Sequence, residues 1–210
     1  MVPKTVKSKR THERVLREAA QLFSVKGYYA TSVEDVMGRV GLTKGGFYAH
    51  FASKEALGRA VIEHAAEVWF ERVVAHVHRF SDPRVQLREL LEAYRLYATS
   101  RTFEGGCFFV NLAVEMDDQH EDFRRLVAER FDQFRAMVAT LVESGKAQGV
   151  YRDDAPSEAI GIAVVAYLTG TMMLSKSAGT FSLFETANPL MVELLASHET
   201  SPPPAAASQE

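Results

Sequence analysis

The chain has 210 residues, 47% of them apolar and 24% charged, and its formal net charge is −3. These values suit one or two globular domains with a sizeable core and exclude a protein that is basic as a whole. The single cysteine, Cys107, excludes an intramolecular disulfide framework and fits a reducing cytoplasm.

Charge is distributed unevenly along the chain. Residues 1–55 hold ten Lys and Arg against five Asp and Glu, a formal charge of +5, which leaves −8 for the remaining residues. A basic head on an acidic body is typical of a nucleic-acid-binding module joined to a domain with another task. The basic first ten residues are not followed by an apolar run, so we expect no secretory signal and a cytoplasmic protein.

The first quarter of the chain predicts short helices behind a flexible basic arm of residues 1–10. One helix runs from about Thr11 to Lys26. A second follows Ser32, which forms a capping box with Asp35, and Gly41 ends it in a left-handed conformation.

The third predicted helix, residues 44–51, is unusual because Gly45 and Gly46 stand near its start. Each costs roughly 1 kcal/mol relative to alanine, which a helix used only for packing seldom carries. Two phenylalanines one turn apart anchor the helix inward. The side chains left for the outer surface suit contacts with phosphates and bases and are Thr43, Lys44, Tyr48 and His50.

The rest of the chain also predicts helices and no convincing strand. A long helix extends from Ser53 to about Arg79, and Pro83 follows its end. Further helices are expected at 85–100, 107–116, 121–148, 154–175 and within 182–196, where Pro189 must interrupt, kink or begin the helix. The acidic run 117–122 fits a solvated helix N-terminus better than a cation site.

The predicted fold class is all-α: a three-helix helix-turn-helix head in residues 11–52, a long connecting helix, and a helical ligand-binding and dimerisation bundle, about nine helices in total. The bundle completes a second domain, residues 53–200, before a disordered tail at 201–210. Residues 159–175 form a long uncharged stretch, which falls just short of a comfortable membrane span. We therefore expect a doubly buried helix there and no membrane association.

Residues 41–57, GLTKGGFYAHFASKEAL, resemble the helix-turn-helix of the tetracycline-repressor (TetR) family of bacterial regulators. The family's spacing is also met by Ala19, Ala20, Leu22 and Phe23 and by the Gly27-Tyr28 pair, so that the motif covers about a quarter of the chain. The resemblance implies a homodimer that binds a pseudo-palindromic operator on double-stranded DNA and releases it when a small molecule enters the C-terminal domain.

The resemblance also assigns contacts to single residues. Lys44 and the Gly45-Gly46 surface would meet base edges, with Thr43 at the helix start, while phosphates would be bound by Thr31, Tyr48, His50 and Lys54. The sequence departs from the commoner family pattern at Gly46 and Ala49, so its operator need not resemble that of a relative.

The C-terminal helices are rich in aromatic residues, some of which should line a ligand cavity although any single one is more often core. We expect an apolar or aromatic effector. The candidate ligand-binding residues are Trp69, Tyr94, Tyr97, Phe103, Cys107, Phe108, Asn111 and Tyr167. Cys107 is either a thiol whose pKa is lowered at a helix start, suited to sensing electrophiles or oxidants, or a small buried hydrophobe.

The last two helices carry the predicted dimer interface, a four-helix arrangement across a two-fold axis. Its candidate residues are Gly161, Val164, Leu168, Met172, Leu190 and Leu194. We find no zinc-spaced ligand set, nucleophile elbow or oriented catalytic group, and expect no cofactor, no metal and no enzyme activity. An architectural DNA binder without sequence preference, and an activator in place of a repressor, remain open alternatives.

Overall fold

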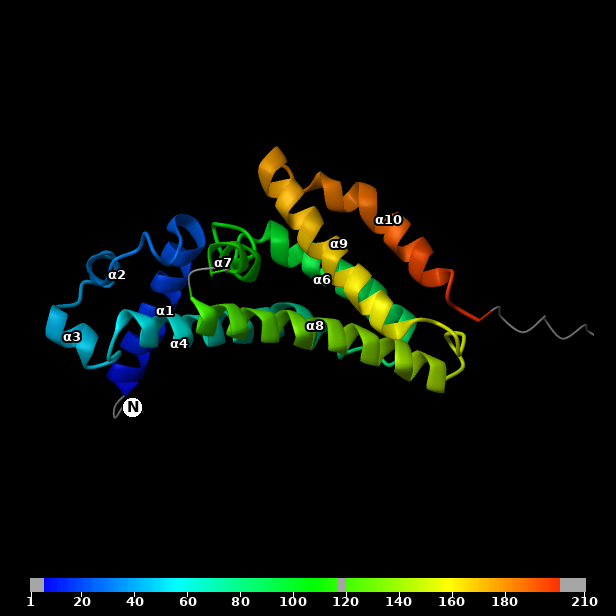
Figure 1. The fold of residues 1–210 in the computed structure, drawn as a ribbon, viewed down its shortest axis with the longest axis horizontal. Helices are drawn as coiled ribbons and strands as arrows, with labels where there is room; N and C mark the ends of the chain where they lie inside the picture. Colours follow the sequence, from blue (N-terminus) through cyan, green and yellow to red (C-terminus); the bar gives the residue numbers. More distant parts are fainter. Residues whose placement is uncertain (1–5, 117–119, 201–210) are drawn as a thin grey trace, which may run out of the picture.

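The computed structural model describes residues 6–116 and 120–200, which form helices and connecting turns (Figure 1). Within these residues the one β-type pairing is an isolated bridge between Tyr151 and Glu199. The prediction of an all-α fold is confirmed. Residues 117–119 of the acidic run, the first half of the predicted arm and the predicted tail lie outside the described residues.

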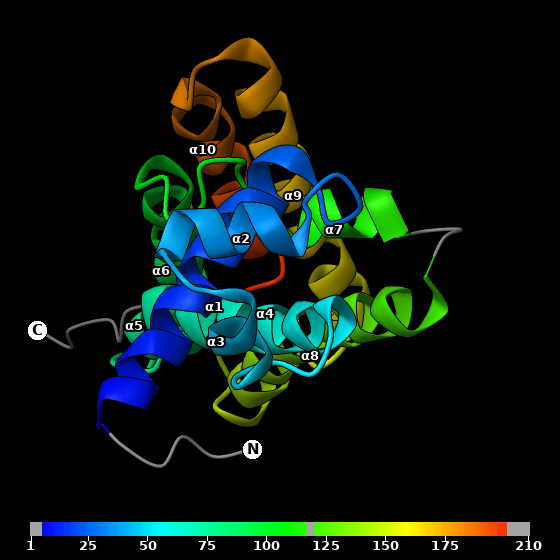
Figure 2. The same cartoon turned by 90° about the vertical axis from the view of Figure 1, so that its left-hand side faces the viewer.

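The head consists of α1 (Val6–Lys26), α2 (Val33–Val40) and α3 (Lys44–Tyr48) and forms one end of an elongated molecule (Figures 1 and 2). The capping box predicted for α2 is present: the amide of Asp35 donates to the Ser32 hydroxyl, and the Asp35 carboxylate accepts from the Ser32 amide. Gly41 ends α2 with φ 63°. The start and the end of α2 are therefore set by the capping residues predicted from the sequence.

The first helix begins earlier than predicted. Residues 6–10, expected to belong to a flexible arm, are the first turns of α1. No proline or glycine stands between Val6 and Thr11, so nothing in the sequence stops the helix from extending backward. The arm prediction is wrong for these residues.

The long connector is less regular than predicted. It consists of α4 (Lys54–Trp69), the π-helical segment η1 (Phe70–Val74) and α5 (Ala75–Val77), which follow one another without a break. If these three count as one, the described residues hold nine helices, as predicted. A π segment inserts an extra residue into a helical turn and is frequently found at functional sites. The residues next to it line a cavity described below.

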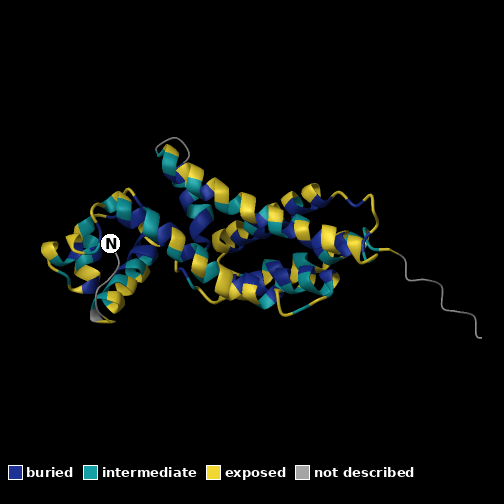
Figure 3. Cartoon of the chain, turned by 90° about the horizontal axis from the view of Figure 1, so that it is seen from below, coloured by how far each residue is buried: buried dark blue, intermediate teal, exposed yellow. Residues whose placement is uncertain are grey.

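The bundle contains α6 (Pro83–Thr99), α8 (Glu121–Ala147), α9 (Ser157–Ala178) and α10 (Ser182–Ala196). Helix α7 (Phe108–Met116) lies between this bundle and the head (Figure 1). α9 packs extensively along α8. Buried residues recur along the helices of the bundle, alternating with exposed ones (Figure 3). α10 continues through Pro189, which was expected to interrupt, kink or begin it.

Among the described helices, only α9 has the length and hydropathy of a membrane span. It carries buried side chains against α8 and also contacts α10. Its apolar character therefore serves packing between helices of the bundle.

Candidate nucleic-acid interface and ligand cavity

The outer surface of α3 gathers most of the predicted DNA contacts at the tip of the head. Thr43 caps the helix, because its hydroxyl accepts from the amide of Gly46 at 3.2 Å. Lys44 and Gly45 are exposed, and Tyr48 is 47% exposed. Phe47 is fully buried and holds the helix against the head. This arrangement presents a cation, a phenol and bare backbone on one short helix.

The fold itself does not require the glycine at position 45. A Cβ atom built there would have no atom within 4 Å, whereas one at Gly46 would already touch Thr43 and Leu42. The backbone of Gly45 has no positive φ. The absence of a side chain at this position is therefore unexplained by packing and suits close approach to another surface.

The structure contradicts a direct phosphate contact by the Thr31 side chain. Thr31 is fully buried, and its hydroxyl donates to the carbonyl of Gly27 at 2.7 Å. Thr31 lies in the turn before α2, where this hydrogen bond joins the two ends of the turn. Thr31 therefore shapes the turn.

Lys54 is half-buried at the start of α4. Its ammonium donates to the carbonyl of Tyr29 at 3.3 Å and lies 4.4 Å from the ring centroid of Tyr28. Burial lowers its pKa and raises that of Tyr28 to about 12. Lys54 therefore has a role within the head in addition to its predicted role at phosphates. His50 is half-buried, with its ring centroid 5.8 Å from that of His12.

A carboxylate from α7 attaches the head to the rest of the molecule. Both oxygens of Glu115 accept from backbone amides, one from Tyr28 at 2.8 Å and the other from Tyr29 at 2.7 Å. These amides follow α1 and precede the helix-turn-helix. Hydrogen bonds to a charged acceptor are about twice as strong as neutral ones, so Glu115 fixes the angle at which the head leaves the body.

A second attachment joins α1 to the loop before α7. The amide group of Asn111 donates to the carbonyls of Ser24 and Gly105, at 3.1 and 2.8 Å. A Cβ atom at Gly105 would lie 1.7 Å from the Ser24 carbonyl oxygen, so only glycine fits. Asn111, predicted to bind the ligand, is part of this joint, where its side chain satisfies backbone carbonyls, and it does not line the cavity described next.

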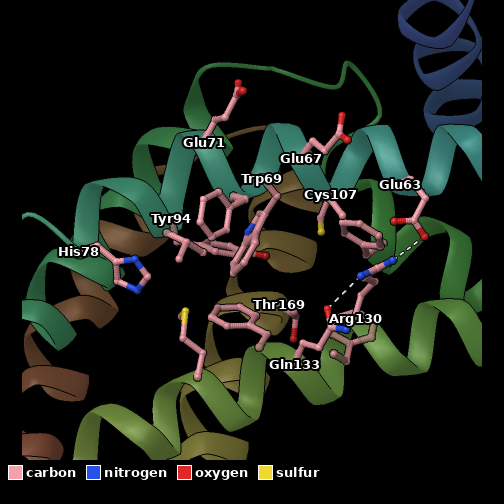
Figure 4. Close-up of a pocket in the computed structure, with 17 residues that line it drawn as sticks. Glu63, Glu67, Trp69, Glu71, His78, Tyr94, Cys107, Arg130, Gln133 and Thr169 are labelled. Carbon is pink, nitrogen blue, oxygen red and sulfur yellow. Dashed lines mark hydrogen bonds and ion pairs between the residues drawn. The ribbon is translucent and has the colours of Figure 1, made fainter. Parts of the chain in front are cut away.

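A cavity of about 570 Å³ lies between α4, η1, α6, α7, α8 and α9 (Figure 4). Its walls are mainly apolar and aromatic, which is the usual character of a small-molecule site. The lining residues are Glu63, Ala66, Glu67, Trp69, Phe70, Glu71, Val74, His78, Tyr94, Cys107, Phe109, Arg130, Phe131, Gln133, Phe134, Met137 and Thr169.

Three of the predicted ligand-binding residues line this cavity: Trp69, Tyr94 and Cys107. The others do not. Phe103 and Phe108 are buried against each other, with ring centroids 5.5 Å apart. Tyr167 bonds to Asn188 of α10, on the far side of α9. Tyr97 is buried next to Tyr94 but outside the cavity wall.

Cys107 is buried immediately before α7, and its sulfur faces the cavity (Figure 4). Burial raises the pKa of this thiol, although hydrogen bonds from the amides of Val110 and Phe109 and from Tyr94 oppose the effect. The expectation of a lowered pKa is therefore wrong. Cys107 does lie at the start of a helix, whose amides lower the thiol pKa, but the effect of burial on the pKa is larger.

Sequence reasoning missed the residues that α8 contributes to the cavity. Phe131 and Phe134 follow the apolar period of α8 and could only be identified as core. Arg130 forms an ion pair with Glu63 of α4 and an NH···O bond of 3.0 Å to Gln133 (Figure 4). Nothing in the sequence pairs two residues 67 positions apart.

The residues predicted for the dimer interface are exposed on α10 and buried on α9. Val164, Leu168 and Met172 are buried. A Cβ atom at Gly161 would lie 2.6 Å from the Arg135 carbonyl oxygen of α8, so this glycine serves packing within the chain. Leu190 and Leu194 of α10 are exposed, together with Ile162 and Met173 of α9. The predicted residues of α9 therefore pack within the chain, and the sequence does not distinguish the faces of this helix because apolar residues surround it.

Two family models match the chain. One, described as the bacterial regulatory proteins of the tetR family, matches residues 15–61, and the other, described as the tetracyclin repressor-like C-terminal domain, matches residues 83–189, about half of the chain. A solved TetR transcriptional regulator from Chloroflexus aurantiacus J-10-FL is 32% identical, covers 93% of this chain and 98% of its own, and superposes with a TM-score of 0.88.

Other relatives agree. The HTH-type transcriptional repressor DhaR of Mycobacterium sp. (strain GP1) is 25% identical over 165 residues, which cover 78% of this chain and 81% of the relative. The fold also matches a cysteine mutant of the TetR family transcriptional regulator CifR in complex with 26-base-pair operator DNA, with a TM-score of 0.79, 20% identity, and coverage of 86% and 94%. The chain belongs to the TetR family and is a transcriptional regulator.

Proposed function

We propose that the protein is a homodimeric cytoplasmic repressor that binds a pseudo-palindromic operator through α3 and releases it when an effector occupies the cavity. One observation carries this proposal: the connector that starts beside the head at Lys54 continues into the cavity wall, where Trp69 and Phe70 line the cavity. A ligand that displaces this wall therefore displaces the connecting helix on which the head is mounted. The operator complex of CifR supports DNA binding by the same fold.

The test is selection of bound fragments from the source genome, followed by gel shifts of the enriched fragment. We expect a palindromic site, with binding that weakens steeply as salt rises because phosphate contacts supply most of the affinity. Lys44→Ala should lower affinity and relax the sequence preference, whereas Lys54→Ala should weaken binding to all DNA alike. If random duplex and the enriched fragment bound with equal affinity in the gel shifts, the protein would instead be an architectural DNA binder.

A second candidate function is regulation by covalent modification of Cys107. The observation that favours it is the position of the sulfur at the cavity wall, where an electrophile small enough to enter would meet it. Its test is the Cys107→Ser variant. If this variant still releases the enriched fragment with every compound that acts on the unmodified chain, the covalent mechanism is excluded and the noncovalent one stands.

A further inference from the structure

Two residues that line the cavity each carry a buried polar atom without an oxygen or nitrogen partner among the described residues, and both atoms can donate a hydrogen bond. The Tyr94 side chain is buried, and its hydroxyl reaches no oxygen or nitrogen of the described residues. Its polar neighbour is the thiol of Cys107, and sulfur is a weak acceptor. The Nε of Arg130 is likewise buried and unpartnered in the described part of the chain, although its terminal nitrogens bond to Glu63 and Gln133.

The acidic residues around the cavity do not offer an acceptor to a bound amine. The carboxylate of Glu63 is paired with Arg130. Those of Glu67 and Glu71 point away from the cavity, toward the outer side of the connector (Figure 4). A cationic group bound inside would lose its hydration without gaining a partner, which is costly.

An acidic ligand is disfavoured as well. Arg130 is the cavity's one Lys or Arg among the described lining residues, and Glu63 already neutralises it. A carboxylate that enters would lose its hydration without meeting an unpaired Lys or Arg among the described lining residues, which is costly.

We propose that the cavity takes a neutral compound with an apolar or aromatic body and a carbonyl-type oxygen that accepts a hydrogen bond from the Tyr94 hydroxyl. The aromatic walls hold the body, and the oxygen satisfies a buried donor that the chain leaves without an oxygen or nitrogen partner. This assignment of an effector class rests on the proposed function of the cavity.

The chain carries its own reporter for a binding test. Trp69 is its one tryptophan and lines the cavity. Four probes share a naphthalene body and differ in one group: methyl naphthyl ketone, ethylnaphthalene, the naphthoate anion and protonated naphthylmethylamine. Titration at neutral pH, followed by quenching of Trp69 fluorescence and checked by calorimetry, should give the ketone the highest affinity, about tenfold above both charged probes.

Two Tyr→Phe variants test whether the Tyr94 hydroxyl binds the ketone. They separate this effect from the general effect of removing any buried tyrosine hydroxyl. Tyr94→Phe should weaken the ketone about two- to tenfold and leave ethylnaphthalene unchanged, because one neutral hydrogen bond is lost. Tyr97→Phe is the matched control, since its hydroxyl is also buried and unpartnered among the described residues but its side chain does not line the cavity. It should change neither affinity.

Three results would overturn the assignment: tighter binding of the acid or the amine than of the ketone, an equal loss for ketone and hydrocarbon in Tyr94→Phe, or no binding of any probe. Release of the enriched DNA fragment by the ketone is measured separately. A ketone that binds through Tyr94 without releasing DNA upholds the ligand class and contradicts the proposed effector-driven release.

Discussion

Gly45 lies on the outer surface of α3. Adding one methyl group there, in Gly45→Ala, should affect DNA binding without disturbing the fold. A Cβ atom there touches nothing within the chain. We therefore expect Gly45→Ala to raise the free energy of unfolding by up to about 1 kcal/mol, because alanine favours the helix. Affinity for the enriched fragment should fall about tenfold or more, because the methyl group blocks the approach of the base edges.

Gly38 of α2 provides the matched control. It is also an exposed helical glycine whose added Cβ would meet nothing within 4 Å, but it lies outside α3. Gly38→Ala should show the same gain in urea unfolding with unchanged fluorescence anisotropy of labelled DNA. Retained affinity in Gly45→Ala would contradict the assignment of this surface to the DNA.

The thiol of Cys107 should alkylate slowly at neutral pH. Burial raises its pKa, so the reactive thiolate is a minor species there. Because the chain has one cysteine, iodoacetamide labels a single site. The rate should keep rising to a higher pH in the folded chain than in the urea-unfolded chain, which should level off near the ordinary cysteine pKa of about 8.5. A plateau below about pH 8 in the folded chain would show a lowered pKa.

At the scale of elements, α7 is the part of the body that holds the head. Glu115→Ala removes the acceptor of the Tyr28 and Tyr29 amides. The free energy of unfolding should fall by about 1–3 kcal/mol, since two amides lose a charged partner. Hydrogen exchange of these two amides should accelerate, and DNA affinity should drop even without ligand because the angle of the head is no longer fixed.

Glu104 serves as the control for this change. It lies in the loop before α7 and is exposed, and its carboxylate forms no ion pair among the described residues. Glu104→Ala should alter neither exchange nor affinity. If Glu115→Ala lowered stability and left both of these readouts unchanged, α7 would support the fold without positioning the head.

Elements defined by local signals were predictable from the sequence. Ser32 with Asp35 and Thr43 fix the starts of α2 and α3 through bonds within four residues. The cavity depends on tertiary neighbours: Tyr94 and Tyr97 lie one turn apart on α6, and only the packing of α8 decides which of them faces the cavity. The same limit explains α9, whose apolar residues on all sides give no preferred direction.

At the scale of the whole molecule, exposed apolar residues on the last two helices are the surface to which the proposed dimer would bind its second copy. Leu190 is 70% exposed, and Ile162 and Met173, three turns apart on α9, are about half exposed. Such side chains gathered on two adjacent helices are typical of an interaction surface. A two-fold dimer through α9 and α10 would place two heads about one turn of DNA apart, roughly 34 Å.

Leu190→Glu should therefore convert the dimer into a folded monomer, because a carboxylate at the centre of an apolar interface loses its hydration without a partner. Sedimentation should show the monomer, circular dichroism should remain helical, and affinity for the full palindrome should fall to that for one half-site. Leu96→Glu on α6 is the control, since Leu96 is 51% exposed and belongs to neither helix of the predicted interface. A Leu190→Glu chain that still sediments as a dimer would place the interface elsewhere, and binding of the full palindrome would then persist in both variants.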